Sequence, residues 1–182
     1  MPMSSDHMVR RSFLVAASAL ALGLPAKAAA SAPGTRAGEA HLYSAARSAG
    51  EWRALLTATE YEVLREGRTE FPFTSPLWNE TRLGLYRCRG CDLPLFDADW
   101  KVQLDKGWPF FRYARDDAFL TRPESLPPGY GANSQPGLSR SETVLELHCR
   151  RCASHVGHLL PVESDFLHCV NGIALKFESA GA

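Results

Sequence analysis

The chain has 182 residues, 45% of them hydrophobic, with 20 basic and 20 acidic side chains. Once the first fifty residues are set aside, about 132 remain, which suits one domain with its own core. No basic block or stripe stands out, so a nucleic-acid partner is not expected.

Residues 1–30 are typical of an export signal. The adjacent Arg10 and Arg11 precede an apolar run over residues 13–24, and small residues at 26–28 offer a cleavage site. The run has 12 residues, too few for the about 20 that span a bilayer, and no other segment is apolar enough to do so. Paired arginines favour the twin-arginine route, with the ordinary route for unfolded chains as the alternative. We therefore expect the mature protein in the periplasm.

Removing this signal leaves 17 basic and 19 acidic side chains, a net charge of −2. Residues 31–50 are small and polar, which predicts a flexible linker before a domain over residues 51–182.

Residues 51–67 space apolar side chains at helical intervals and end in glycine. We expect a helix there, in one or two pieces, with Thr59 as a possible cap. Prolines in the following segment, residues 69–78, predict an extended conformation.

The rest of the chain predicts antiparallel β-structure, so the fold class is mainly β (α+β) with a small N-terminal helical part. Residues 83–96 predict two short strands around a tight knuckle. Residues 142–149 alternate between apolar and polar, and residues 166–177 share this pattern if that strand is uninterrupted. Residues 122–140 are rich in proline and glycine, which predicts a long loop of the kind that is often functional.

Four of the five cysteines form two CxxC pairs, Cys88 with Cys91 and Cys149 with Cys152, separated by 57 residues. A CxxC knuckle directs two sulfurs at one point, and two knuckles complete a tetrahedral zinc site with Zn–S bonds of about 2.3 Å. Disulfides are the alternative in an oxidising compartment. A redox CxxC is less consistent with the pattern, because it normally opens a helix. A chain that folds before export can load zinc while its thiols are reduced.

The fifth cysteine, Cys169, has no partner in an exported protein and is therefore a candidate reactive thiol. His155 and His158 follow the second knuckle closely. A histidine can supply positive charge or accept a proton near neutral pH, which a thiol needs in order to become a thiolate. Each of the three could instead be structural, because a free cysteine is by default a small buried hydrophobe.

Residues 55–177 resemble the zinc-containing branch of the B-type peptide-methionine sulfoxide reductases. The resemblance is carried, in the family's order, by LTATEYEVLREGRTEFPFTSPLW, LYRCRGCDLPLF, KGWPFF, HCRRCASHVGHLL and CVNGIALKF. It implies two antiparallel sheets in a β-tent-like domain with a zinc site of four cysteines. It also implies a nucleophile, two active-site histidines, an asparagine beside the nucleophile and a substrate-facing tryptophan: Cys169, His155, His158, Asn171 and Trp108. By themselves, Trp108 could be a core residue and Asn171 a turn residue.

The implied chemistry suits these residue types. A sulfoxide sulfur becomes electrophilic when its oxygen is protonated, so the Cys169 thiolate would attack while His155 or His158 donates a proton. The products are methionine and a sulfenic acid on Cys169, and the resemblance implies the R epimer. The implied partners are oxidised proteins or peptides and an external thiol reductant such as a thioredoxin-like protein.

The chain departs from the family at several positions. Lys106 stands where many relatives have a resolving cysteine, so an external thiol must reduce the sulfenic acid. Leu167 replaces an arginine, which should raise the pKa of Cys169 unless Lys106 or His168 substitutes. Two usual serines are also replaced, by Phe110 and Gly172. These departures keep an alternative open: a weakly catalytic or non-catalytic zinc domain that binds oxidised methionine or senses oxidants.

Overall fold

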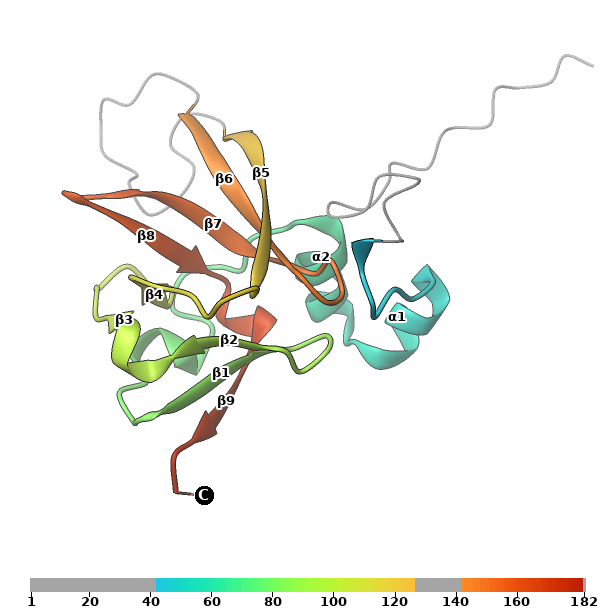
Figure 1. Ribbon diagram of the computed structural model, residues 1–182, viewed down its shortest axis with the longest axis horizontal. Coiled ribbons are helices and arrows are strands. Elements are labelled where there is room, and N and C mark those ends of the chain that lie inside the picture. The colour runs from blue at the N-terminus through green and yellow to red at the C-terminus, as the bar shows by residue number, and fades with distance from the viewer. Residues whose placement is uncertain (1–41, 127–141, 182) are drawn as a thin grey trace, which may run out of the picture. The chain divides into compact units, whose positions relative to one another are not determined.

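The computed structural model describes residues 42–126 and 142–181 (Figure 1). The expected signal, most of the expected linker and residues 127–140 of the expected loop lie outside these ranges. Within them, no helix is long and apolar enough to cross a membrane. The elements are α1 (Ala49–Leu55), α2 (Ala58–Glu66), β1 (Gly84–Cys88), β2 (Pro94–Asp97), β3 (Lys101–Val102), β4 (Phe110–Phe111), β5 (Phe119–Leu126), β6 (Glu142–Cys149), β7 (His155–Val162), β8 (Asp165–Val170) and β9 (Leu175–Ser179).

Two short helices open the domain, each started by a capping box. Ser48 and Thr57 are the N-caps of α1 and α2, and a glutamate three residues later returns the hydrogen bond in each box. Helix α2 ends at Gly67, whose φ of 70° is left-handed. The division into two pieces is confirmed. The cap is Thr57 rather than Thr59: the Thr57 side chain accepts from the backbone N–H of Glu60, and the Glu60 carboxylate accepts from the backbone N–H of Thr57.

The packed domain starts earlier than residue 51. Tyr43 is 6% exposed, and the backbone N–H of Ala45 donates to the carbonyl of Arg151 at 2.8 Å. The segment just before α1 is therefore fixed to the second CxxC knuckle. The expected linker boundary at residue 50 is too late by several residues, since an apolar side chain in this otherwise small and polar stretch packs on the fold.

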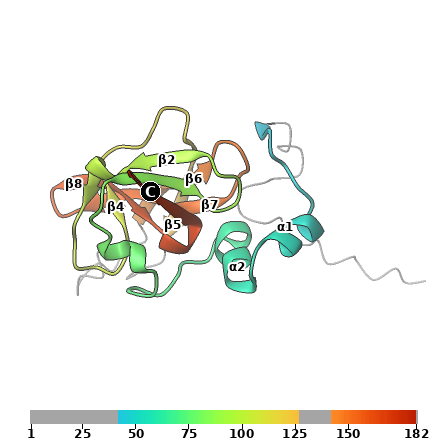
Figure 2. The same cartoon turned by 90° about the horizontal axis from the view of Figure 1, so that it is seen from below.

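The strands form two antiparallel sheets, ordered β2-β1-β9 and β3-β4-β8-β7-β6-β5 (Figure 1). This confirms a mainly β fold with two antiparallel sheets. Strands β1 and β2 are the two expected around the first knuckle. The helices lie at one end of the sheets (Figure 2). Part of the expected loop from residue 122 is instead strand β5, which accommodates Pro123 because β5 is at the edge of its sheet.

The expected strand over residues 166–177 is interrupted. Strand β8 ends at Val170 in the large sheet, a 3-10 turn covers Gly172–Ala174, and β9 joins the small sheet. Cys169 and the residues of β9 therefore do not share one face. The reason is that each sheet takes one half of the segment, which sequence alternation alone does not reveal.

Two apolar clusters occupy opposite faces of the large sheet. Phe111 belongs to the main core, where its ring stacks on Phe96 with centroids 4.2 Å apart. Phe110, its neighbour in β4, projects to the other face. There it forms a second cluster with four buried aliphatic side chains, against which Trp108 and Cys169 also pack. The second cluster consists of Phe110, Val144, Leu160, Val162 and Leu167. It places the candidate nucleophile beside an apolar surface.

Candidate active site and metal centre

Cys169 lies in the middle of the large sheet, on β8 between β4 and β7. Its Cα pairs with those of Phe110 on β4 and His158 on β7. On β6, Glu146 pairs with His158. Directly opposed residues of antiparallel strands project from the same face. The thiol, the imidazole and the carboxylate therefore form one cross-strand row, although Cys169 and Glu146 are 23 residues apart in sequence.

Both histidines after the second knuckle are held by carboxylates. His155 Nδ1 is 2.7 Å from Glu146 Oε1, and His158 Nε2 is 2.9 Å from Glu124 Oε2. The other oxygen of Glu146 is 2.9 Å from His148 Nε2. The rings of His155 and His158 meet edge to face with centroids 5.2 Å apart. The two predicted histidines are thus brought together and oriented.

Burial and charge set the protonation of this network. Burial by itself raises the pKa of Glu146, but the imidazoles of His148 and His155 outweigh it and hold that pKa well below its usual range. Burial lowers the pKa of His158, the nearby His155 lowers it further, and Glu124 opposes both. The result is an ionised Glu146 beside a His158 that tends to be neutral and can accept a proton.

The Cys169 thiol is partly buried, and its pKa is raised to about 12, chiefly by burial and then by the Glu70 carboxylate. The Lys106 cation opposes this shift. Leu167 is buried in the second cluster and contributes no charge. His168 faces the main core, where its Nδ1 is 3.1 Å from the carbonyl of Phe111. Of the two substitutes considered for the missing arginine, only Lys106 acts on the thiol.

We therefore expect the alkylation rate of Cys169 by iodoacetamide to rise about ten-fold per pH unit up to pH ~10. The thiolate fraction grows in this way below a raised pKa, whereas an ordinary thiol levels off near pH ~8.5. Peptide-resolved mass spectrometry of the metal-loaded protein measures the rate. Lys106→Met should slow alkylation at a fixed pH near 9, and Lys176→Met, on β9, should not. A plateau below about pH 9 would contradict the raised pKa.

Glu70 is a site residue that the sequence did not single out. Its carboxylate accepts the backbone N–H groups of Gly172 and, at 3.0 Å, of Ile173. Its own N–H donates to Asn171 Oδ1 at 3.0 Å, and its carbonyl accepts from Trp108 Nε1 at 3.2 Å. One buried residue thus ties the predicted asparagine to the predicted tryptophan.

These bonds define what the two predicted residues do. Both polar atoms of the Asn171 side chain bond to backbone, since Nδ2 also donates to the carbonyl of Val156 at 3.3 Å. Its geometry is that of a positioning residue. Trp108 is partly buried against the second cluster beside Cys169, and its indole N–H donates to the carbonyl of Glu70. Gly172 is required here because a Cβ would collide with Ser75.

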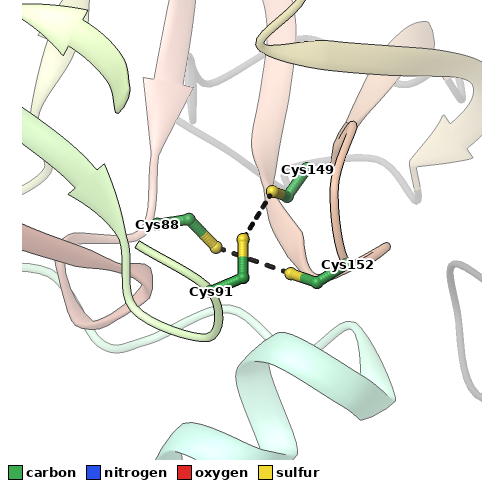
Figure 3. A group of neighbouring side chains, drawn as sticks. All are labelled: Cys88, Cys91, Cys149 and Cys152. Carbon is green, nitrogen blue, oxygen red and sulfur yellow. Dashed lines mark hydrogen bonds between the residues drawn. The ribbon is translucent and has the colours of Figure 1, made fainter. Parts of the chain in front are cut away.

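The four knuckle cysteines converge on one point (Figure 3). All four Sγ atoms lie within 4.8 Å of one another, with Cys88 3.7 Å from Cys152 and Cys91 3.5 Å from Cys149. A tetrahedral site with Zn–S bonds of about 2.3 Å has S–S edges of about 3.8 Å. The spacing fits a bound zinc ion. It does not fit disulfides, whose sulfurs are about 2.05 Å apart.

The two knuckles share one backbone geometry. In the first, the N–H of Asp92 donates to the carbonyl of Cys88; in the second, the N–H of Ala153 donates to the carbonyl of Cys149, both at 2.9 Å. Asp92 and Ala153 have left-handed φ values of 65° and 60°. Each chain therefore reverses tightly enough to present both sulfurs on the same side, as the CxxC spacing predicted.

Side chains around the cysteines suit a metal. Arg65 is buried, donates to the carbonyl of Cys152 at 3.0 Å and lies over the ring of Trp52 at 4.7 Å. Its cation offsets the net negative charge of a zinc tetrathiolate. Ser154 Oγ is 3.2 Å from Cys152 Sγ, and a Cβ at Gly90 would lie 2.8 Å from that hydroxyl. The glycine inside the first knuckle leaves room for this contact.

Comparison with known proteins gives one consistent result. Residues 56–179 match the SelR domain model. The peptide methionine sulfoxide reductase MsrB of Agrobacterium fabrum (strain C58 / ATCC 33970) is 37% identical over 136 residues, covering 72% of this chain and 91% of the relative. MsrB of Cellvibrio japonicus (strain Ueda107) is 37% identical over 131 residues, covering 70% and 85%. Peptide methionine sulfoxide reductase B3 of Arabidopsis thaliana is 32% identical over 137 residues, covering 72% and 69%.

Proposed function

Because the chain belongs to the SelR-domain family of peptide methionine sulfoxide reductases, we propose that Cys169 is its nucleophile and that an external thiol completes the cycle. The protein is an oxidoreductase, a peptide-methionine (R)-S-oxide reductase. The observation that carries the assignment of roles is the cross-strand row, in which Cys169 and His158 are paired residues of adjacent strands.

The first half-reaction transfers oxygen from methionine sulfoxide to Cys169. The Cys169 thiol gives its proton to the neutral ring of His158, and its sulfur attacks the sulfoxide sulfur. The protonated imidazole then donates to the sulfoxide oxygen. The oxygen then moves from the methionine sulfur to the Cys169 sulfur as the bond between the two sulfurs breaks, so methionine leaves and Cys169 becomes a sulfenic acid. The sulfoxide is reduced by two electrons and the thiol is oxidised by two, so the step needs no other reductant.

The neighbours of His158 support this proton transfer. The Glu124 carboxylate, 2.9 Å from Nε2, stabilises the imidazolium that forms when the thiol gives up its proton. His155 is fixed by the ionised Glu146 and contacts the His158 ring from the side. We assign His155 and Asn171 positioning roles, and we assign Trp108 the surface against which the substrate's S-methyl group packs.

The second half-reaction requires a thiol from outside the chain. The other four cysteines form the metal cluster, and Lys106 occupies the position of the family's resolving cysteine. An external thiol attacks the sulfenic acid, forming a mixed disulfide and releasing water. A second thiol then releases Cys169 and leaves as part of a disulfide. We propose a thioredoxin-like protein as this reductant and oxidised proteins as the substrates.

Zinc at Cys88, Cys91, Cys149 and Cys152 is part of this proposal, as a structural ion that takes no part in the reaction. His155 begins β7 three residues after Cys152, so the metal would fix the strand that carries both histidines.

We also propose export to the periplasm by the twin-arginine route, with residues 1–30 as signal and a flexible linker up to the packed domain. Arg10, Arg11 and the apolar run after them support this.

The proposal is tested by offering the zinc-loaded protein a methionine-R-sulfoxide peptide and its S epimer, each with dithiothreitol. We expect methionine from the R epimer in step with dithiothreitol oxidation, and none from the S epimer. Chromatography of the peptides measures both products.

The raised pKa of Cys169 favours a second candidate function, that of a weakly catalytic domain that binds oxidised methionine or senses oxidants. Tight binding of the R peptide without turnover would select that alternative.

A further inference from the structure

A groove lies next to the active site, on the other side of Glu70. Its volume is about 790 Å³, within the range of sites that enclose several side chains of a ligand. Its walls come from α2, from residues 68–77 and from Gly172 and Ile173, which follow the nucleophile's strand. Neither the thiol nor the histidines line it, so it is a separate feature that shares one wall with the reacting groups.

That shared wall is rigid. The carboxylate of Glu70 binds the backbone of Gly172 and Ile173 on the groove side, while its carbonyl holds the indole of Trp108. An extended peptide advances about 3.3 Å per residue. A polypeptide whose methionine sulfoxide reaches Cys169 and whose chain continues across Glu70 would bring its next few residues to the groove.

Phe71 lies at the groove, 82% exposed, the most exposed of the large apolar side chains in residues 42–126 and 142–181. Its backbone is nevertheless fixed. Its carbonyl accepts from Thr74 Oγ1 at 2.7 Å, and the N–H of Phe73 donates to the carbonyl of Gly107 at 2.9 Å. Phe73 has a left-handed φ of 65°, a strained conformation for an aromatic residue. The segment is held in a form that presents Phe71 to solvent.

The charges around the groove do not select a charged ligand. Each of its cations has an acidic partner: Arg68 with Glu62, Arg82 with Glu80, Arg89 with Glu60 and Lys176 with Asp92. The surface left between these pairs is apolar and includes Leu77, Ile173 and Phe177. This part of the groove is therefore suited to bind an uncharged, apolar side chain.

We propose that Phe71 and this groove bind an apolar side chain located within about three residues of the methionine sulfoxide in an extended polypeptide. The inference rests on the proposed function, because it takes the substrate to be a peptide presented at Cys169. Methionine is mostly buried in folded proteins, and residues two positions away in a strand, or three or four away in a helix, share its buried face and are therefore often apolar. The groove thus makes the flanking sequence a determinant of which oxidised methionines are reduced.

The test uses the full zinc-loaded chain and two peptides that differ only in having leucines or aspartates around the methionine-R-sulfoxide. With saturating dithiothreitol, we expect the wild type to favour the leucine peptide roughly ten-fold in kcat/KM, about what partial burial of one such side chain supplies. Phe71→Ser should reduce this ratio to about one, mainly through KM. The matched control is Phe166→Ser, which removes another exposed phenylalanine, from the face of β8 opposite Cys169.

Three outcomes would overturn the inference: equal kcat/KM for both peptides in the wild type, an unchanged ratio in Phe71→Ser, or the same loss in Phe166→Ser. A loss seen only when a thioredoxin replaces dithiothreitol would also overturn it and assign the groove to the reductant. If the wild type reduces neither peptide, the proposed function fails instead. Fluorescence polarisation with labelled peptides and the Cys169→Ser protein still tests the groove in that case, because it needs no turnover.

Discussion

Cys169→Ser abolishes reduction of methionine-R-sulfoxide, with a loss of at least about 10⁴-fold in kcat, as expected for removal of a covalent nucleophile. A serine hydroxyl does not attack a sulfoxide sulfur at neutral pH and cannot carry the oxygen as a sulfenic acid. The replacement is nearly isosteric, and Cys169 is only partly buried, so folding and metal content should be preserved. Chromatographic detection of methionine measures the loss.

Two further measurements distinguish loss of the nucleophile from misfolding of the Cys169→Ser protein. Circular dichroism and zinc content of Cys169→Ser should equal those of the wild type. In the wild type, dimedone should trap a sulfenic acid on Cys169 after one turnover without reductant, and mass spectrometry of the peptide identifies the adduct. Turnover by Cys169→Ser within ten-fold of the wild type would remove Cys169 from the proposed chemistry.

Cys88→Ser unfolds the domain or severely destabilises it, because the proposed zinc ion would connect elements that are distant in sequence. Cys88 ends β1 in the small sheet and Cys149 ends β6 in the large sheet, and both are fully buried. Binding of structural zinc contributes roughly 10 kcal/mol or more in isolated zinc-binding peptides, comparable with the whole stability of a domain, about 5–15 kcal/mol. Three remaining thiolates bind zinc far more weakly than four.

The measurements are zinc content and the thermal unfolding midpoint, followed by circular dichroism. We expect Cys88→Ser to lose the metal and to show no cooperative transition above room temperature. Cys169→Ser serves as the matched cysteine replacement and should retain both. A metal-free Cys88→Ser protein that melts at the wild-type temperature would show that the cluster does not stabilise the fold.

Much of the site could be predicted from local sequence, because its geometry is local. A CxxC knuckle fixes two sulfurs through one tight turn, and both turns form as the spacing predicted. Cys169 could be singled out because the other four cysteines were accounted for. The two helices and the strands around the first knuckle could be predicted for the same reason: caps, glycines and alternation act within a few residues.

Other features depended on which strands become neighbours. Glu70, Glu124 and Glu146 carried no recognisable signal, since each acquires its role from a partner in a different strand or segment. Glu146 and His148 are polar members of the alternating strand β6, and their burial came only with the packing of other strands against that face.

The sequence alone was sufficient to identify the four cysteines that converge, the thiol outside that cluster and the resemblance that led to the family. Only the tertiary structure decided that β8 and β9 belong to different sheets, and that His158 on β7 lies directly opposite Cys169. The physical reason is register. Side chains alternate across a strand with a period of two, so the partners of a residue are set by long-range strand pairing, which no local pattern encodes.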